Sequence, residues 1–186
     1  MGRRGDTRQR IQDVALELFA EHGYEKTSLR EIAEHLDVTK AALYYHFKAK
    51  EDILVSLFDD LGRPVDELIE WGKRQLGTLD TKRELLARYS LAVQDAIVLF
   101  RFMQENQATI RELGVGEAFR DRMLAMIRLL CDGSADLTAR VRCTTALVAM
   151  HAGVFALEDV EGDPEEKRRA ILEVAQELVS AAHPTA

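Results

Sequence analysis

Apolar residues recur at helical spacing along most of the chain. The clearest case lies near the N-terminus, where five apolar residues repeat at i, i+3, i+4, i+7 and i+8: Ile11, Val14, Ala15, Leu18 and Phe19. This spacing places them on one face of an amphipathic helix, and Gly23 suits the left-handed residue that ends such a helix. No segment has strand periodicity and no repeat is found, so the sequence predicts an all-α fold of about nine helices.

Two short helices joined by a tight turn are predicted next. Ser28 and Glu31 have the S-x-x-E spacing of a capping box at the start of the first. The apolar stripe of this helix is Leu29, Ile32, Ala33 and Leu36. Thr39 is placed to cap the second helix, with Val38 and Leu43 as its hydrophobic staple. With the helix before them, they form a predicted three-helix unit of about fifty residues.

Longer helices are expected beyond residue 50, with boundaries set by glycine, proline and aspartate. The predicted features, in chain order, are a helix from Glu51 to the mid-seventies that is kinked or split at residues 62–64, a helix from Thr81 through the run AIVLF at 96–100, a break at 114–116, a helix to Cys131, a turn at 132–134, a helix to Glu158, a break at 162–164, and a last helix to Ala182.

Composition indicates a folded protein without a membrane segment. The chain is 47% hydrophobic and 31% charged, and it contains three prolines, so we expect no flexible linker. The longest apolar run, residues 146–157, is shorter than the roughly 20 residues of a membrane span. The N-terminus does not have the pattern of a secretory signal. Cys131 and Cys143 lack CxxC spacing, and we expect them to be reduced core residues of a cytoplasmic protein.

Charge is distributed unevenly along the chain. The net charge of −7 argues at first against a nucleic-acid partner. However, residues 1–50 hold nine Lys or Arg and eight Asp or Glu, a net charge of +1, so the remaining residues carry −8. This asymmetry indicates that a polyanionic partner would meet the N-terminal quarter.

The stretch VTKAALYYHFKAK at residues 38–50 has two chemically different faces. At helical spacing, Leu43 and Phe47 share one side, and the opposite side holds Lys40, Ala41, Tyr44 and Tyr45. A helix-turn-helix motif places such a second helix in the DNA major groove. Tyrosine suits that position because its hydroxyl can bond a phosphate or a base, and its ring can contact a thymine methyl.

Two neighbouring cations extend this interpretation. Lys50 would begin the next helix, where its charge and free backbone N–H groups could together hold a phosphate. Arg30, one helix earlier, could reach a base edge or the backbone. The alternative is a small helical subdomain with solvated lysines, whose tyrosines pack on a neighbouring element.

The run TSLREIAEHLDVTKAALYYHFKAKEDIL, residues 27–54, resembles the DNA-binding segment of the TetR family of bacterial transcriptional regulators. The resemblance covers residues 7–55, because the capping box, the I-A pair, the turn, L-Y-x-H-F and K-x-K-E all fall at the family's spacings. Asp37 departs from it, since the family usually has glycine in this turn. Asp tolerates the left-handed conformation better than most residues, so the motif is still expected to form.

The resemblance implies that operator DNA is contacted at nine positions: Ser28, Arg30, Thr39, Lys40, Ala41, Tyr44, Tyr45, His46 and Lys50. Tyr44 and Lys50 match phosphate-binding positions. The matches to base-reading positions are Arg30, Lys40, Ala41 and Tyr45. The family also implies a domain division, with DNA binding in residues 1–50 and effector binding and dimerisation in residues 51–186.

For the larger domain, the resemblance implies a homodimer on a palindromic operator, released by a small-molecule effector and built without a cofactor or a metal. Its final two helices would form the dimer interface, to which we assign Ala149, Ala152, Gly153, Ala156, Ile171, Val174, Ala175 and Leu178. The alternative for these residues is packing within one subunit. Bulky apolar and adaptable side chains are candidates for an effector pocket: Trp71, Tyr89, Phe100, Met103, Met123, Met126, His151 and Phe155.

Other classes of protein have less support. No Gly-rich phosphate loop, HExxH, GxSxG or di-iron carboxylate–histidine pattern occurs, so we expect no enzyme. A second alternative is an all-α ligand-binding or scaffold protein that does not bind an operator.

Overall fold

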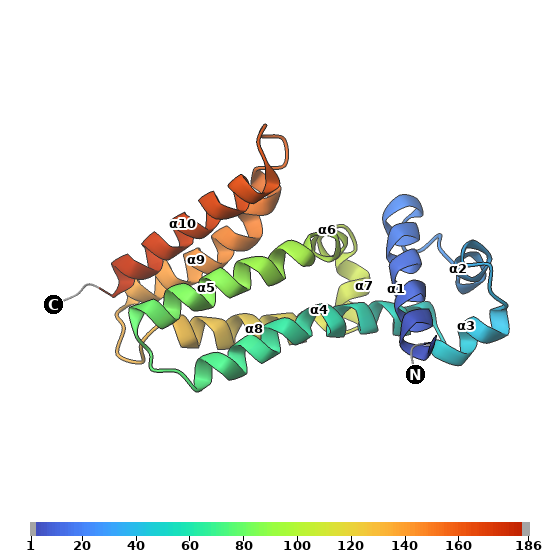
Figure 1. The fold of residues 1–186 in the computed structure, drawn as a ribbon, viewed down its shortest axis with the longest axis horizontal. Helices are drawn as coiled ribbons and strands as arrows, with labels where there is room; N and C mark the ends of the chain where they lie inside the picture. Colours follow the sequence, from blue (N-terminus) through green and yellow to red (C-terminus); the bar gives the residue numbers. More distant parts are fainter. Residues whose placement is uncertain (1–2, 184–186) are drawn as a thin grey trace. The chain divides into compact units, whose positions relative to one another are not determined.

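The computed structural model describes the backbone of residues 3–183 and the side chains of residues 7–94 and 96–183. These residues form ten α-helices and no strand, which confirms the all-α prediction (Figure 1). The helices are α1 (Arg3–His22), α2 (Leu29–His35), α3 (Lys40–His46), α4 (Lys50–Lys73), α5 (Leu79–Asp95), α6 (Ile97–Glu105), α7 (Gln107–Glu112), α8 (Val115–Leu130), α9 (Leu137–Ala156) and α10 (Pro164–Ala182).

The chain divides into two compact units. The first contains residues up to 60 together with 98–116, and the second contains residues 61–97 and those from 117 onward. Helix α4 therefore begins in the first unit and ends in the second. None of the helices in the described part of the chain is long and apolar enough to cross a membrane.

The core of the first unit is built on the apolar face predicted for α1. Ile11, Ala15, Leu18 and Phe19 are each at most 2% exposed. The Phe19 ring meets the edge of Tyr24 at a centroid distance of 5.0 Å, and Phe102 of α6 lies 5.8 Å from Tyr24. Gly23 has φ +86°, the left-handed residue expected after α1.

A buried polar bridge joins α1 to the first part of α4. Gln12 is 1% exposed, and its Nε2 donates to Ser56 Oγ at 2.9 Å and to Asp60 Oδ2 at 2.7 Å. A buried amide without these acceptors would cost free energy, so the bridge fixes the position of α1 along α4.

Helices α9 and α10 run side by side in the second unit, with α5 next to α10 (Figure 1). A Cβ added to Gly153 of α9 would lie 2.9 Å from Ile171 Cδ1 of α10, closer than side chains normally pack. The absence of a side chain at Gly153 thus permits the close approach of these two helices. Cys131 and Cys143 are both buried and free, as the sequence predicts.

Helix α4 differs from the prediction, because it runs through residues 62–64 without splitting. Pro64 lies inside it, although proline removes one backbone hydrogen bond and crowds the preceding turn. Leu68 and Ile69, one turn further on, are each 6% exposed. Burial of this apolar face offsets the local cost of proline, which a local sequence pattern cannot reveal.

The helix expected from Thr81 through residues 96–100 is interrupted. Helix α5 ends at Asp95, Ala96 is its C-cap, and α6 begins at Ile97. The prediction of one helix here was wrong, and this break adds to the helix count. Val93 belongs to the second unit and Leu99 to the first, and both are buried. The break therefore separates apolar residues that pack in different cores.

Candidate nucleic-acid interface

Helix α3 has the two faces predicted for it. Thr39 Oγ1 accepts a hydrogen bond from the Ala42 amide at 3.2 Å and caps the helix. Leu43 is fully buried and Phe47, the C-cap residue, is 2% exposed. Tyr45 is 67% exposed. The apolar residues of this segment thus pack in the core of the first unit, and its polar side is exposed to solvent.

The remaining candidates on this segment lie around that exposed face. Lys40 and Ala41 are exposed, whereas Tyr44 and His46 are half-buried. The Lys40 ammonium lies 5.3 Å from the centre of the Tyr44 ring, within the range of a cation–π contact. The five side chains therefore combine a cation, two phenols, an imidazole and a small residue, a set that can contact phosphates and base edges.

Helix α2 and the turn after it also follow the local prediction. Ser28 Oγ accepts from the Glu31 amide at 3.2 Å, which is the first half of the capping box. The Glu31 carboxylate lies 2.8 Å from His22 Nδ1. Asp37 has φ +54°, so it takes the left-handed conformation at the position where the family usually has glycine.

Arg30 is on α2 and is exposed to solvent. Its Nε donates to Glu34 Oε1 at 2.7 Å, and this hydrogen bond raises the pKa of the Arg30 guanidinium. Both side chains are mostly exposed, at 77% for Arg30 and 64% for Glu34. An ion pair this exposed is weak, so the guanidinium can exchange Glu34 for another anion at little cost.

Lys50 is the first residue of α4, as predicted, but its ammonium has internal partners. It donates to the Tyr24 carbonyl at 2.9 Å, lies 4.1 Å above the Tyr24 ring and is 3.9 Å from Glu25 Oε2. The side chain is 19% exposed. Lys50 therefore ties α4 to the segment after α1, and its side chain is only partly exposed.

The expectation of free backbone N–H groups at the start of α4 was wrong for two residues. The amides of Lys48 and Ala49 both donate to Asp52 Oδ2 at 3.0 Å. A phosphate would have to displace this carboxylate before it could use those amides. Side-chain capping by the third residue of a helix is common, but no cap was predicted for this helix from the sequence.

Two further cations lie next to the α3 segment and were not predicted as contacts. The Lys48 Nζ donates to the Tyr44 carbonyl at 2.8 Å, and the side chain is exposed. The Arg8 guanidinium lies 4.3 Å from the centre of the Phe47 ring. Lys48 follows α3 directly, and that position was the available sequence signal. Arg8 is brought there by the packing of α1, which no local pattern specifies.

Three of the predicted effector-pocket residues meet inside the second unit. The Tyr89 hydroxyl lies 2.7 Å from His151 Nε2 and 3.3 Å from Met123 Sδ. His151 Nδ1 lies 2.7 Å from the Leu147 carbonyl, which fits a neutral ring that donates from Nδ1 and accepts the Tyr89 proton at Nε2. Burial lowers the pKa of His151 and raises that of Tyr89.

The other pocket candidates are dispersed. Met126 is fully buried in the core of the second unit, and Phe155 on α9 is half-buried. Trp71 lines a surface groove between α4 and α5. Phe100 and Met103 are on α6, in the first unit.

The predicted dimer residues are divided between interior and surface. Within the chain, Gly153 packs on Ile171 and Ala175 is fully buried. Ala149 and Leu178 are half-buried. The exposed members are Ala152, Ala156 and Val174.

Metal chemistry has no obvious location in this part of the molecule. The described residues contain no group of three or more His, Cys, Asp or Glu side chains that could hold a metal ion.

The N-terminal segment is similar to a known family of proteins. Residues 11–57 match the family model described as bacterial regulatory proteins, tetR family. The chain is 41% identical over 83 residues to the HTH-type transcriptional regulator AcrR of Shigella flexneri, an alignment that covers 44% of this chain and 39% of that protein. The alignments with this regulator and with two further curated relatives cover only 26–39% of the lengths of those proteins.

Solved structures are similar over nearly the whole chain. A protein from Syntrophomonas wolfei attributed to the TetR family has a TM-score of 0.72 at 20% identity, and the alignment covers 99% of this chain and 98% of that one. The regulator FadR from Bacillus subtilis in complex with stearoyl-CoA has a TM-score of 0.65 at 22% identity, with coverage of 92% and 97%. At these identities the likeness shows the shared fold. Residues 11–57 therefore match the DNA-binding segment of the TetR family of bacterial regulatory proteins, on a fold similar to that of a solved structure attributed to that family.

Proposed function

We propose that this protein is a sequence-specific DNA-binding transcriptional regulator, a dimeric repressor that a small-molecule effector releases from a palindromic operator. In this proposal residues 1–50 bind DNA, and residues 51–186 bind the effector and form the homodimer. The protein is proposed to act in the cytoplasm, on the nucleoid when bound to DNA, and to have no enzymatic activity.

The observation that carries the proposal is the division of the α3 segment into a buried underside and an exposed face. Leu43 and Phe47 are buried, while Lys40, Ala41 and Tyr45 are exposed. A subdomain whose tyrosines pack on a neighbour would bury Tyr45, which is instead 67% exposed. The geometry favours a helix whose polar face enters a groove.

The contacts suggest different roles for the nine candidate positions. Lys40, Ala41 and Tyr45 are placed to read bases, together with Arg30 once it leaves Glu34. Tyr44, Lys50 and the exposed Lys48 are placed to hold phosphates. The hydroxyls of Ser28 and Thr39 cap helices, so their DNA contacts would use the hydroxyl proton. His46 is half-buried at the end of α3 and would meet the backbone.

A dimer is supported by an exposed apolar stripe on α9 and α10. The large apolar side chains of this stripe are 50–77% exposed: Leu137, Val141, Val148 and Val174. Ala152 and Ala156 continue it along α9 at helical spacing. Such a face is typical of an interface between subunits. Replacing Val148 with Asp should shift the dimer to monomer in sedimentation, whereas Leu76→Asp, in an 81% exposed loop position, should not.

The effector is proposed to bind near the Tyr89, Met123 and His151 cluster. Phe119 contributes an aromatic ring 5.6 Å from His151, and like Met123 it is half-buried. A similar protein, FadR of Bacillus subtilis, was solved with stearoyl-CoA, which supports a ligand-binding role for the fold. Operator and effector would each weaken the other by the same factor if the effector favours a different spacing of the two recognition helices.

The deciding experiment measures affinity for fragments of the source genome while salt is varied. A DNA-binding regulator should select a palindromic fragment, and log affinity should fall linearly with log salt. Equal affinity for all fragments, with no steep salt dependence, would favour the alternative of a ligand-binding or scaffold protein.

Variants separate phosphate contacts from base contacts. Lys48→Ala should weaken binding to all fragments equally and reduce the salt slope by about one. Lys40→Ala should relax preference at one base position by about 1–3 kcal/mol. Lys73→Ala, which removes an exposed lysine of α4 in the second unit, is the matched control and should change neither property.

A further inference from the structure

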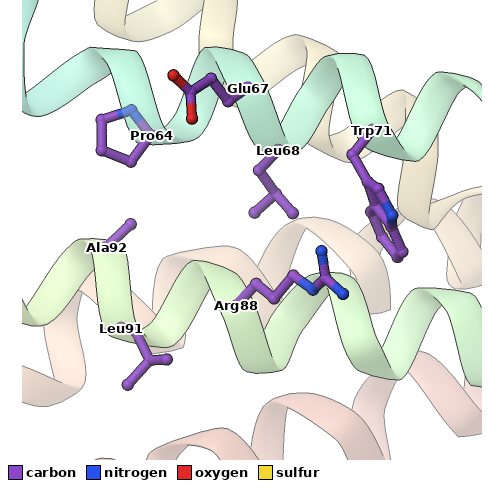
Figure 2. Close-up of a pocket in the computed structure, with 7 residues that line it drawn as sticks. All are labelled: Pro64, Glu67, Leu68, Trp71, Arg88, Leu91 and Ala92. Atoms are coloured by element: carbon purple, nitrogen blue, oxygen red, sulfur yellow. The ribbon is translucent and has the colours of Figure 1, made fainter.

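A groove of about 460 Å³ lies on the surface of the second unit between α4 and α5 (Figure 2). Seven side chains line it: Pro64, Glu67, Leu68 and Trp71 from α4, and Arg88, Leu91 and Ala92 from α5. Its volume falls within the range of sites that hold small molecules.

The groove is separate from the Tyr89 cluster. Leu85, Leu86 and Tyr89 point from α5 into the core and are at most 2% exposed. Arg88 and Leu91 belong to the opposite, exposed side of the same helix, and Leu91 is 53% exposed. A ligand of this groove would therefore bind outside the interior cluster to which the effector is assigned.

One end of the groove carries a cation beside an aromatic ring. The Arg88 guanidinium lies 4.2 Å from the centre of the Trp71 ring, and its Nε donates to Glu84 Oε1 at 2.8 Å. Within the described residues, the two terminal amino groups of Arg88 donate no hydrogen bond to the protein. Arg88 thus has donors left for an anion, in a geometry that suits a carboxylate.

Apart from Glu67, the rest of the groove lining is apolar. Figure 2 shows Leu68 between the two helices, Pro64 and Ala92 together at the end away from Trp71, and the Glu67 carboxylate on α4 beside Pro64. Seven residues of helix separate Pro64 from Trp71, a length of about 10 Å. The lining therefore has one cationic end and an apolar length of that size.

We propose that the α4–α5 groove binds an amphipathic anion, a molecule with one anionic head group on an unbranched apolar body about 10 Å long. The head would take the free amino groups of Arg88 beside Trp71, and the body would lie on Leu68 toward Pro64 and Ala92. Charge complementarity selects this occupant, because Arg88 supplies a cation at the Trp71 end of the groove, whereas the Glu67 carboxylate lies toward Pro64 at the other end. The proposal does not depend on DNA binding.

Trp71 is the single tryptophan of the chain, so its fluorescence reports on this groove directly. The full-length protein is titrated with octanoate, and the same titration is made with octanol and with propionate. Octanoate should change the emission in a saturable, one-to-one manner. Octanol lacks the negative charge, and propionate lacks the apolar body. Each should therefore bind at least about tenfold more weakly than octanoate does.

Three variants test the assignment. Arg88→Gln should weaken octanoate at least about tenfold and leave octanol unchanged, because the charge-assisted hydrogen bonds are lost. Leu91→Ser, at a position that is 53% exposed, should weaken the binding of octanoate and of octanol alike. Arg128→Gln removes an exposed arginine of α8 outside the groove and should bind as the unaltered protein does.

Equal affinity for octanoate in the Arg88→Gln and Arg128→Gln variants would overturn the proposal, as would octanol binding as tightly as octanoate, or an emission change that never saturates. Since the readout needs no DNA, a failure of the proposed regulatory function would leave these results unaffected.

Discussion

Two substitutions in the α3 segment should affect different properties of the protein if one side of the segment is packed in the core and the other side contacts DNA. The first should lower the free energy of unfolding, and the second should lower the affinity for DNA. Leu43 is fully buried, and Tyr45, two residues later, is 67% exposed. We therefore compare Leu43→Ala, which removes apolar contacts from the core of the first unit, with Tyr45→Ala, which removes a side chain from solvent.

The expected magnitudes follow from these exposures. Leu→Ala at a fully buried position costs about 2–5 kcal/mol of unfolding free energy, because transfer and cavity terms add. A surface substitution such as Tyr45→Ala should stay within about 0.5 kcal/mol. If Tyr45 contacts a base, its loss should weaken operator binding by about 1–3 kcal/mol, roughly 5- to 140-fold.

Unfolding free energies are measured by urea denaturation followed by circular dichroism. Operator affinity is measured by fluorescence anisotropy at one fixed salt concentration, on the fragment that the unaltered protein selects. Leu43→Ala should lower stability yet keep the order of preference among fragments wherever it remains folded. Tyr45→Ala should keep stability and lose affinity. Leu76→Ala, at an 81% exposed loop position, is the control for both measurements.

The reasoning is refuted if Tyr45→Ala destabilises the protein as much as Leu43→Ala does. That result would mean the Tyr45 ring is part of a packed interface. It is also refuted if Tyr45→Ala changes neither stability nor DNA affinity, since the exposed face would then carry no recognition.

Two further predictions concern the second unit. Burial lowers the pKa of His151 in the folded protein, whereas in the unfolded chain this pKa is about 6.5. The unfolded chain therefore binds more protons than the folded one as pH falls below about 6.5, and the free energy of unfolding should decrease with it. His151→Gln should flatten this dependence in urea denaturation from pH 7.5 to 5, the exposed-site variant His35→Gln should retain it, and an equally steep dependence in both variants would contradict the assignment. Gly153→Val should cost about 1–3 kcal/mol because its side chain overlaps Ile171. Gly133→Ala, with open space around the added Cβ, should be nearly neutral when both variants are measured by urea denaturation. Equal stabilities of these two glycine variants would show that α9 and α10 do not approach closely at this point.

The sequence alone determined the features that depend on neighbours along the chain. A cap joins residues three apart, so Ser28 and Thr39 could be identified as caps from spacing. Helical spacing likewise identified Leu43 and Phe47 as the buried side of the α3 segment. The left-handed conformation of Asp37 was expected from the resemblance to the TetR family, which usually has glycine at this turn position.

Only the tertiary structure decided which groups meet across long separations in the chain. Lys82 is 2% exposed and donates to Asp132 at 2.5 Å, and this hydrogen bond lowers the pKa of Asp132, yet nothing in the sequence links two residues fifty positions apart. Tyr89 and His151 were both pocket candidates, but their hydrogen bond could not be predicted.

The same limit explains the helix boundaries that the sequence predicted wrongly. Whether α4 continues through Pro64, and whether the chain breaks at Ala96, depends on which core receives the flanking apolar residues. Local propensity contributes a few tenths of a kcal/mol to about 3 kcal/mol at such positions, and the burial of several side chains at roughly 1.5–3 kcal/mol each exceeds it. Local free energies therefore fixed the motif, and packing decided that α4 continues through Pro64 and that α5 ends before Ala96.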